Sequence, residues 1–291
     1  MAKGKVVTVM NMKGGVGKTT VALHLGGMLA RYKLAAPAPR KVLLIDYDPQ
    51  FNLSQALLPA KTYFDLETKR KTTISILLDD DADLNPYQLQ VPGNEIPASI
   101  KDIGTRVFSV SGEGILDLVP STLDLMYVAL GQFAATTKPI EVRFEKFIEE
   151  CRQVYEVIFI DCHPAGSIFT KTALQNSDHV LIPVMPQRYA VRGIGLMMQF
   201  IEAKKAGADK IVAHVLFNAT ARTGVSQEEA VIRANSTYAP MCMTTTLKWY
   251  TAFTEPEGGK GFVWHSGKPW STEAFRNLSA VSQEFAQRIG V

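Results

Sequence analysis

The sequence contains few cysteines and no long hydrophobic run. Its three cysteines, Cys151, Cys162 and Cys242, form no C-x-x-C pair. This argues against a disulfide framework or a metal knuckle and fits a reducing cytoplasm. The longest apolar runs, such as Val180–Val184, have the length of a strand, far below the roughly 20 residues that cross a bilayer. Residues 1–10 lead straight into glycines, so we expect no cleavable signal peptide.

The sequence also has little net charge. Its 31 basic and 28 acidic residues give +3, and its 46% hydrophobic and 20% charged residues are typical of a globular protein rather than a disordered one. The charge is uneven, with eight basic and two acidic residues in 1–60, 13 and 18 in 61–200, and ten and eight in 201–291. Dedicated nucleic-acid-binding domains are usually more basic. The composition therefore permits salt-dependent contact with nucleic acid but does not require it.

Strand and helix patterns alternate along the chain. Apolar, β-branched runs predict strands over residues 5–10, 42–45, 157–160, 180–184 and 211–217. Helical patterns separate them, over residues 19–32, 142–154, 194–205 and 272–289. Continuous apolar strands are typical of parallel sheets that are covered on both faces. The prediction is an α/β fold with a doubly wound, mostly parallel sheet flanked by helices.

Two regions interrupt this alternation. Residues 59–106 contain the charge runs Lys69–Lys71 and Asp79–Asp81 together with Pro86, Pro92 and Pro97, which favours a solvated elaboration. Residues 254–271 are rich in glycine, proline and charge and are expected to form a mobile loop. No repeat is visible, and no helix-turn-helix pattern precedes the first strand. We interpret residues 1–291 as a single domain.

The most informative segment is the glycine-rich run at residues 12–20, Met-Lys-Gly-Gly-Val-Gly-Lys-Thr-Thr, between the first strand and the first helix. Glycines let successive backbone N–H groups turn toward phosphate oxygens, and the helix amino terminus adds partial positive charge. In such a loop, Lys18 reaches the β- and γ-phosphates and the Thr19 hydroxyl is a ligand for Mg²⁺. The general phosphate-loop pattern has glycine at position 12, where this chain has Met12, followed by a second lysine, Lys13.

This loop resembles the deviant Walker A motif of the ATPase family that contains ParA, MinD and the nitrogenase iron protein. The resemblance implies a P-loop fold, ATP and Mg²⁺ as cofactors, and slow ATP hydrolysis. It also implies a homodimer with ATP at its interface, in which Lys13 reaches the partner's phosphates much as an arginine finger does. The nucleotide-binding residues carried over are Lys13, Gly14, Gly15, Val16, Gly17, Lys18, Thr19 and Thr20.

Two acidic residues, Asp46 and Asp48, follow the buried strand at 42–45, where ligands gather in open α/β sheets. Being two residues apart, they are expected to face the same way in an extended chain. The segment resembles the D-x-D-P-Q-x-N box of ParA-like proteins and matches it through Asn52. By this resemblance Asp48 positions the attacking water, and Asp46 lies on the Mg²⁺ side.

A third acid, Asp161, ends the strand at 157–160 and resembles Walker B, with a water-mediated contact to Mg²⁺. The family usually continues D-x-P-P, whereas this chain has Asp-Cys-His-Pro at 161–164. We expect His163 to be a neutral substitution rather than a catalytic base, since no nucleophile motif accompanies it. Cys162 is expected to be a small buried residue.

Three later segments continue the resemblance. Residues 116–125 are similar to a ParA strand and turn, and residues 184–193 to its P-x-P-x-x-x-A-x-x-G segment. Residues 215–218 with 222–223 are similar to the strand and loop near adenine. By this analogy Asn218 is the candidate for bonding the base, and Pro186 lines its pocket.

Within this family, the missing helix-turn-helix pattern implies the short type, which binds DNA nonspecifically as an ATP dimer. It would position a plasmid, a chromosome origin or a protein cargo, would be stimulated by a ParB-like partner or cargo adaptor, and would associate with the nucleoid. The usual arginine motif of the carboxyl half is not recognisable; residues 244–249 take its place. Candidate phosphate contacts are Lys204, Lys205, Lys210, Arg233, Lys248, Lys260, Lys268 and Arg276.

Alternatives remain at the level of the sequence. A MinD-like membrane switch needs a basic amphipathic carboxyl-terminal helix. The pattern at 272–289 has balanced charges, and we expect its apolar stripe to pack on the domain. An iron protein would need paired cysteine ligands, which are absent. A metabolic enzyme that couples ATP to ligation stays open.

Overall fold

The computed structural model describes residues 3–34, 40–79, 82, 84, 92–110, 114–130, 137–163, 167–188, 190–204, 211–254 and 261–291. These residues form one eight-stranded sheet in the order β3-β4-β2-β5-β1-β6-β7-β8. All neighbouring strands are parallel except β3, which runs antiparallel to β4. The strands are β1 (Lys5–Val9), β2 (Lys41–Tyr47), β3 (Thr105–Val110), β4 (Gly114–Val119), β5 (Val157–Cys162), β6 (His179–Val184), β7 (Val212–Thr220) and β8 (Leu247–Lys248). The predicted doubly wound, mostly parallel sheet is confirmed.

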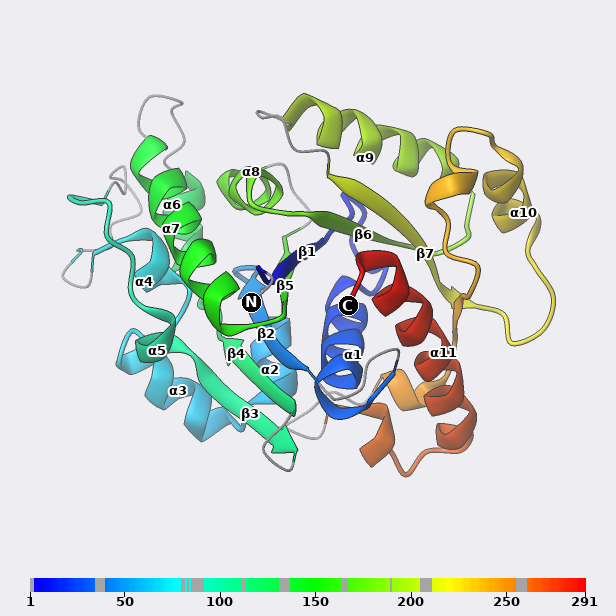
Figure 1. The fold of residues 1–291 in the computed structure, drawn as a ribbon, viewed down its shortest axis with the longest axis horizontal. Coiled ribbons are helices and arrows are strands. Elements are labelled where there is room, and N and C mark those ends of the chain that lie inside the picture. Colours follow the sequence, from blue (N-terminus) through cyan, green and yellow to red (C-terminus); the bar gives the residue numbers. More distant parts are fainter. Residues whose placement is uncertain are drawn as a thin grey trace.

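Helices cover both faces of the sheet (Figure 1). One face packs against α1 (Lys18–Arg31), α2 (Asn52–Leu57), α3 (Ala60–Thr68) and α11 (Ser271–Ile289). The other packs against α4 (Ile74–Leu77), α5 (Ile100–Ile103), α7 (Lys138–Val154), α8 (Ile168–Gln175), α9 (Ala190–Lys204) and α10 (Gln227–Ala234). A short α6 (Leu125–Leu130) and 3₁₀ turns at Ala239–Met241, Thr251–Phe253 and Val263–His265 complete the described elements.

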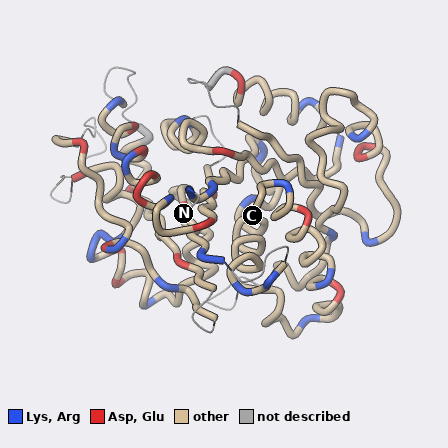
Figure 2. Tube along the Cα trace, viewed as in Figure 1, with Lys and Arg blue, Asp and Glu red and all other residues tan. Residues whose placement is uncertain are grey.

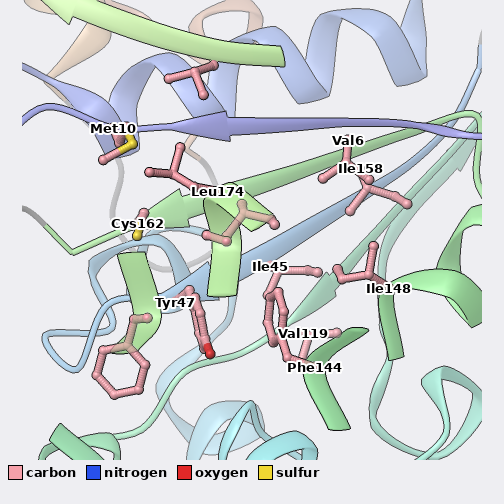
Figure 3. Packing of buried hydrophobic residues seen from close by; sticks show 14 of the residues in the cluster. Val6, Met10, Ile45, Tyr47, Val119, Phe144, Ile148, Ile158, Cys162 and Leu174 are labelled. Atoms are coloured by element: carbon pink, nitrogen blue, oxygen red, sulfur yellow. The ribbon is translucent and has the colours of Figure 1, made fainter. Parts of the chain in front are cut away.

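The core consists of the aliphatic strand residues and the helices that cover them. Every residue of β5 and β6 is buried, as expected for parallel strands between two helical layers. Figure 3 shows Ile45 of β2 beside Phe144 of α7, and Val6 of β1 beside Ile158 of β5, in the same cluster. The ring of Tyr47, at the end of β2, stacks on that of Phe144 with centroids 4.8 Å apart. This packing holds the carboxyl ends of β1, β2 and β5 in fixed relation.

Aromatic residues within the predicted loop at 254–271 pack against α1. Phe262 and Val263 are buried, and the Phe262 ring stacks on Trp264 at a centroid separation of 4.5 Å. A Cβ on Gly27 of α1 would lie 2.4 Å from a ring carbon of Phe262, so glycine permits this close approach. Residues 261–264 thus pack against the domain, whereas residues 267–270 are exposed and residues 255–260 lie outside the described residues. The mobility of the segment stays a prediction.

The last helix, α11, packs along α1 (Figure 1). Its predicted apolar stripe is turned into the core, with Leu278, Val281 and Phe285 fully buried and Ile289 2% exposed. The expectation that this helix packs on the domain is confirmed. Among the described residues, no helix combines the length and hydropathy needed to cross a membrane.

The elaboration at 59–106 is more firmly attached than its charge runs suggested. Its α4 is buried, and the guanidinium of Arg143, from α7, reaches in to bond the carbonyls of Ile76 and Leu78 and the carboxylate of Asp79. Arg143 itself is 2% exposed. Lys69 and Lys71 are exposed, as expected for a solvated charge run, whereas residues 80 and 81 lie outside the described residues. Burial of α4 required a partner cation that lies far away in sequence.

Two buried histidines set a pH dependence for folding. His24 of α1 is fully buried, and burial lowers its pKa from the ordinary 6.5 to about 3. For His214 of β7, burial and neighbouring cationic groups lower the pKa to about 4. The unfolded chain therefore binds more protons than the folded chain between pH 6.5 and these values. Their contribution to the free energy of unfolding is complete above pH 6.5 and is lost as the pH falls toward about 3 to 4.

We expect His24→Leu to flatten the decline in melting temperature between about pH 7 and pH 4, because leucine removes a group that must be buried uncharged. The matched control is His265→Asn, on the exposed side of the aromatic cluster. Melting curves of both variants and the wild-type chain across this range test it. The same downward slope in His24→Leu as in the wild type would contradict the assignment.

Candidate nucleotide-binding site

The glycine-rich run forms the turn from β1 into α1. Gly15 and Gly17 have φ values of 73° and 86°, in the left-handed region that favours glycine, and Gly17 is the amino-terminal cap of α1. No side chain caps this end of the helix. Its first N–H groups and its positive dipole end are therefore available to an anion.

Lys18, the first residue of α1, is the buried cation of the site. Its side chain is 8% exposed, and its Nζ donates to the carbonyl of Lys13 at 3.4 Å, across the mouth of the loop. Burial lowers the pKa of Lys18, while the charges of Asp161 and Asp48 oppose that shift. A partly desolvated ammonium held over a loop of N–H groups suits the binding of phosphate oxygens.

Lys13, by contrast, is exposed, and its side chain is held away from that of Lys18. Its Nζ donates to Oε1 of Gln187 at 2.8 Å, beyond the end of β6. Its backbone N–H donates to Oδ1 of the buried Asn11 at 2.9 Å, and Nδ2 of Asn11 donates to the carbonyl of Pro183 at 2.8 Å. The start of the loop is thus fixed to the carboxyl end of β6, and the two lysines are held separately.

Asn218 ties β7 to the other end of the loop. Its Nδ2 donates to the carbonyl of Val16 at 2.8 Å, and a Cβ on Gly17 would lie 2.3 Å from that nitrogen. The next residue, Ala219, has φ 52°, and the pairing of β7 with β8 shifts register there. Such a bulge redirects side chains beside a site. Asn218, proposed from the sequence as the residue that bonds adenine, therefore donates from its side-chain nitrogen to the backbone of the phosphate loop.

Asp161 is the carboxylate best suited to a cation. It ends β5, pairs in register with Val9 of β1 and Asp46 of β2, and is 2% exposed. Neither of its oxygens has a partner with hydrogen-bond geometry among the described residues, although the Thr19 hydroxyl lies close enough to counter the shift in its pKa. Burial and the charge of Asp48 raise this pKa to about 7. An unpartnered buried carboxylate beside a hydroxyl fits Mg²⁺, which would be held by Thr19 and Asp161.

Asp46 and Asp48 have different surroundings. Strand β2 ends at Tyr47, so Asp46 lies within it and Asp48 directly follows it. The Asp46 carboxylate is fully buried and takes hydrogen bonds from Ser54, whereas the Asp48 carboxylate is 9% exposed and accepts from the N–H of Gln50 at 2.9 Å. Burial and the neighbouring Asp161 raise the pKa of Asp46 well above its ordinary value. Of the three acids, Asp161 and Asp48 are the two whose charges raise the pKa of Lys18 against the effect of burial.

The remaining predicted residues border this site. Pro186 is half-buried just after β6, and Thr20 lies in the first turn of α1. His163 follows β5 directly and is half-buried. Cys162 is fully buried, and burial raises the pKa of its thiol, as expected for a small core residue; Figure 3 shows it in the cluster with Met10 and Leu174.

Four polar residues that the sequence reasoning did not single out complete the site: Asn11, Ser54, Ser121 and Gln187. Each is bonded to a predicted residue or to its backbone. Asn11 directly precedes the loop, Ser54 lies two residues after the matched box at 46–52, and Ser121 and Gln187 lie in the matched segments at 116–125 and 184–193. Their position beside matched motifs was the available signal, but nothing in the sequence specified their partners.

These features define a P-loop nucleoside triphosphatase: a glycine loop between β1 and α1, a buried lysine, and acids at the ends of β2 and β5. A family model described as an AAA domain matches residues 4–213. The chromosome-partitioning ATPase Soj of Treponema pallidum is 30% identical over 241 residues, which cover 81% of this chain and 79% of that protein. The sporulation initiation inhibitor protein Soj of Bacillus subtilis is 28% identical over 280 residues, 95% of this chain and 97% of that protein.

A solved structure of pNOB8 ParA bound to nonspecific DNA superposes with a TM-score of 0.61 at 19% identity, covering 99% of both chains. This likeness concerns the fold. The chain belongs to the ParA/Soj-like family of P-loop ATPases.

Proposed function

We propose that the chain is an ATPase that dimerises on ATP, binds DNA without sequence preference, and releases it after hydrolysis, so that it positions a plasmid, a chromosome origin or a protein cargo. The observation that carries this proposal is the separation of the two lysines. Lys18 is buried over its own loop, while Lys13 is exposed at the rim and bonded to Gln187. A cation at the rim can reach phosphates bound by a second copy of the chain.

Hydrolysis in this proposal uses groups that the site already holds. Bound Mg²⁺ would neutralise charge on the phosphates. Lys18, the loop N–H groups and the partner's Lys13 stabilise the charge on the transferred phosphoryl group, and Asp48 positions the attacking water. The adenine would lie between Pro186 and Asn218. The name of the Treponema pallidum relative, a chromosome-partitioning ATPase, supports chromosome partitioning as the class of role.

The candidate DNA-contacting residues differ in their exposure and in their partners. Arg233 bonds Glu229 and the carbonyl of Met243 and lies over the ring of Phe217, so it is occupied within the domain. Arg276 is exposed on α11. Lys205, Lys210 and Lys260 lie outside the described residues, as does the side chain of Lys204. Lys and Arg are spread along the trace rather than gathered in one region (Figure 2).

One contiguous basic and aromatic surface stands out beside β8. The Nζ of Lys248 donates to the carbonyl of Arg222 at 2.8 Å, and the Arg222 guanidinium lies 5.2 Å from the ring centroid of Trp270. Trp270 and Trp249 are 59% and 55% exposed. Two neighbouring cations, one of them over the exposed ring of Trp270, form a surface that suits a phosphate backbone. The solved pNOB8 ParA structure is bound to nonspecific DNA, which supports this choice of ligand.

We expect Arg222→Ala/Lys248→Ala to weaken retention of random duplex DNA in the presence of ATP. The slope of log K against log salt should become shallower by roughly two for each protomer, since each lost phosphate contact removes about one unit. Binding is measured by fluorescence anisotropy over a salt series, with ATP, ADP and no nucleotide. The control is Lys146→Ala on α7, an exposed lysine paired with Glu95. DNA binding by the wild-type chain that is indifferent to nucleotide or salt would contradict the proposed function.

Release of DNA in this proposal depends on a ParB-like partner or cargo adaptor that stimulates hydrolysis, and the expected location is the cytoplasm, on the nucleoid. The MinD-like alternative is less well supported, because the apolar stripe of α11 is buried against α1 and the sheet. A stripe used in this way offers no apolar face to a membrane.

A further inference from the structure

A chain of buried hydrogen bonds joins Asp46 to the backbone of Asp48 through two serines. Ser54 donates to Oδ2 of Asp46 twice, from its N–H at 2.8 Å and from its Oγ at 2.6 Å. The N–H of Ser121 donates to Oγ of Ser54 at 2.9 Å, and Oγ of Ser121 donates to the carbonyl of Asp48 at 2.7 Å. Asp46, Ser54 and Ser121 are each fully buried.

The direction of every bond in this chain is fixed. The single hydroxyl proton of Ser54 goes to Asp46, so its oxygen is the acceptor for Ser121. The hydroxyl proton of Ser121 goes to the Asp48 carbonyl. Asp46, which has no proton to donate when ionised, is the final acceptor. Buried polar chains in which each member is satisfied hold their parts in one arrangement.

The chain connects three separate elements around Asp48. Asp46 lies in β2, Ser54 in α2, and Ser121 just after β4. Together they fix the Asp48 carbonyl, and the Asp48 N–H also faces Oδ1 of Asp46 at 3.4 Å. The Asp48 carboxylate accepts a hydrogen bond from the N–H of Gln50 and is not bonded to either serine, and the residue is 9% exposed. The chain therefore holds the Asp48 backbone through groups other than its carboxylate.

We propose that Asp46 is a positioning residue for Asp48, acting through Ser54 and Ser121, and is not a ligand of the metal. This rests on the proposed hydrolysis, in which Asp48 positions water. Oδ2 of Asp46 accepts two hydrogen bonds from Ser54, so fewer of its lone pairs are available to Mg²⁺ than those of Asp161, whose oxygens have no partner among the described residues. A shift of about 1 Å in a positioned group is enough to slow a reaction greatly.

The first experiment removes the links one at a time. Ser54→Ala and Ser121→Ala should each lower kcat for ATP by about 10-fold or more with KM nearly unchanged, because the P-loop is untouched and only the geometry of the water-positioning group is relaxed. Ser54→Thr keeps the hydroxyl and should restore kcat. The matched control is Ser282→Ala, which deletes an equally buried hydroxyl that bonds the Leu278 carbonyl in α11; its kcat should be unchanged.

The second experiment separates positioning from metal binding. In the Asp48→Ala background, adding Ser54→Ala should cause no further loss of the residual rate, because the chain acts only through Asp48. Asp46→Asn should leave unchanged the Mg²⁺ concentration that gives half of the thermal stabilisation by ATP. A rise of about 10-fold in that concentration for Asp46→Asn, with none for Ser54→Ala, would assign Asp46 to the metal and overturn the proposal.

A third measurement keeps the inference testable if hydrolysis itself is not found. Amide hydrogen exchange over residues 47–52 should rise by about 10-fold in Ser54→Ala and Ser121→Ala and not in Ser282→Ala, since those two substitutions alone release the segment. Equal exchange in all variants would refute the positioning role, whatever the activity. A wild-type chain without ATPase activity, but with the expected change in exchange, would instead count against the proposed function.

Discussion

Asp48→Ala is expected to bind ATP and to persist as an ATP dimer while its hydrolysis falls by about 100-fold or more, the usual effect of losing a group that acts on the attacking water. The physical reason is its place in the site. Asp48 directly follows β2 and its carboxylate accepts only from the N–H of Gln50 among the described residues, whereas the Asp46 carboxylate is bonded to Ser54. The phosphate-binding parts, Lys18 and the loop backbone, are left in place.

Size-exclusion chromatography with light scattering, run with ATP and Mg²⁺, measures the dimer, and phosphate release measures the rate. Asp65→Ala, on the exposed surface of α3, is the matched control for removing a carboxylate. If the Asp48→Ala chain stays monomeric with ATP, or hydrolyses ATP at the wild-type rate, the water-positioning assignment is wrong.

Lys13→Ala is expected to retain weak ATP binding but to lose both ATP-driven dimerisation and hydrolysis, the rate falling by about 1,000-fold, as for cations supplied in trans. Lys18 alone lies over the loop of its own protomer, so nucleotide affinity depends mainly on Lys18 and the N–H groups. Lys33→Ala, an exposed lysine just beyond α1, is the control.

Mixing two inactive variants gives the sharpest form of this test. In a dimer of one Lys13→Ala and one Lys18→Ala chain, the first supplies an intact loop and the second an intact rim lysine, so one of the two sites is complete. Each mixed dimer should hydrolyse ATP at roughly half the rate of a wild-type dimer, since one of its two sites is complete, and neither variant alone forms a complete site. No restoration, or full activity of Lys13→Ala alone, would contradict a lysine acting across the interface.

Much of the fold follows from alternation in the sequence, since β1, β2, β5, β6 and β7 are continuous apolar runs bounded by helical patterns. Strand β8 could not be predicted, because a two-residue strand carries no periodicity. Strand β3 begins at the end of the charged, proline-rich region, and its residues are at most half-buried, so its apolar pattern is weak. The buried α4 was missed for a different reason. Its stability depends on Arg143, which lies in a helix more than 60 residues away.

The site was predicted best where a motif fixes the backbone locally. The glycine turn before Lys18 depends on its own residues, and the φ values of Gly15 and Gly17 agree with it. The orientation of Asp46 depends instead on where β2 stops and on a serine in the following helix. A rule based on spacing holds only while the chain stays extended, and β2 ends between Asp46 and Asp48.

The bond from Asn218 to Val16 joins the phosphate loop to the same strand that pairs with Lys248 in β8. If both proposed ligands bind, ATP would contact the loop that is bonded to β7, and DNA would contact Lys248 of the neighbouring β8. Strand β7, with its bulge at Ala219, would then connect the two ligand sites. Reciprocity then applies: any factor by which ATP tightens DNA binding is also the factor by which DNA tightens ATP binding. Bound DNA would thus be an allosteric effector that raises the affinity of the chain for ATP, in addition to being the surface on which the chain is held.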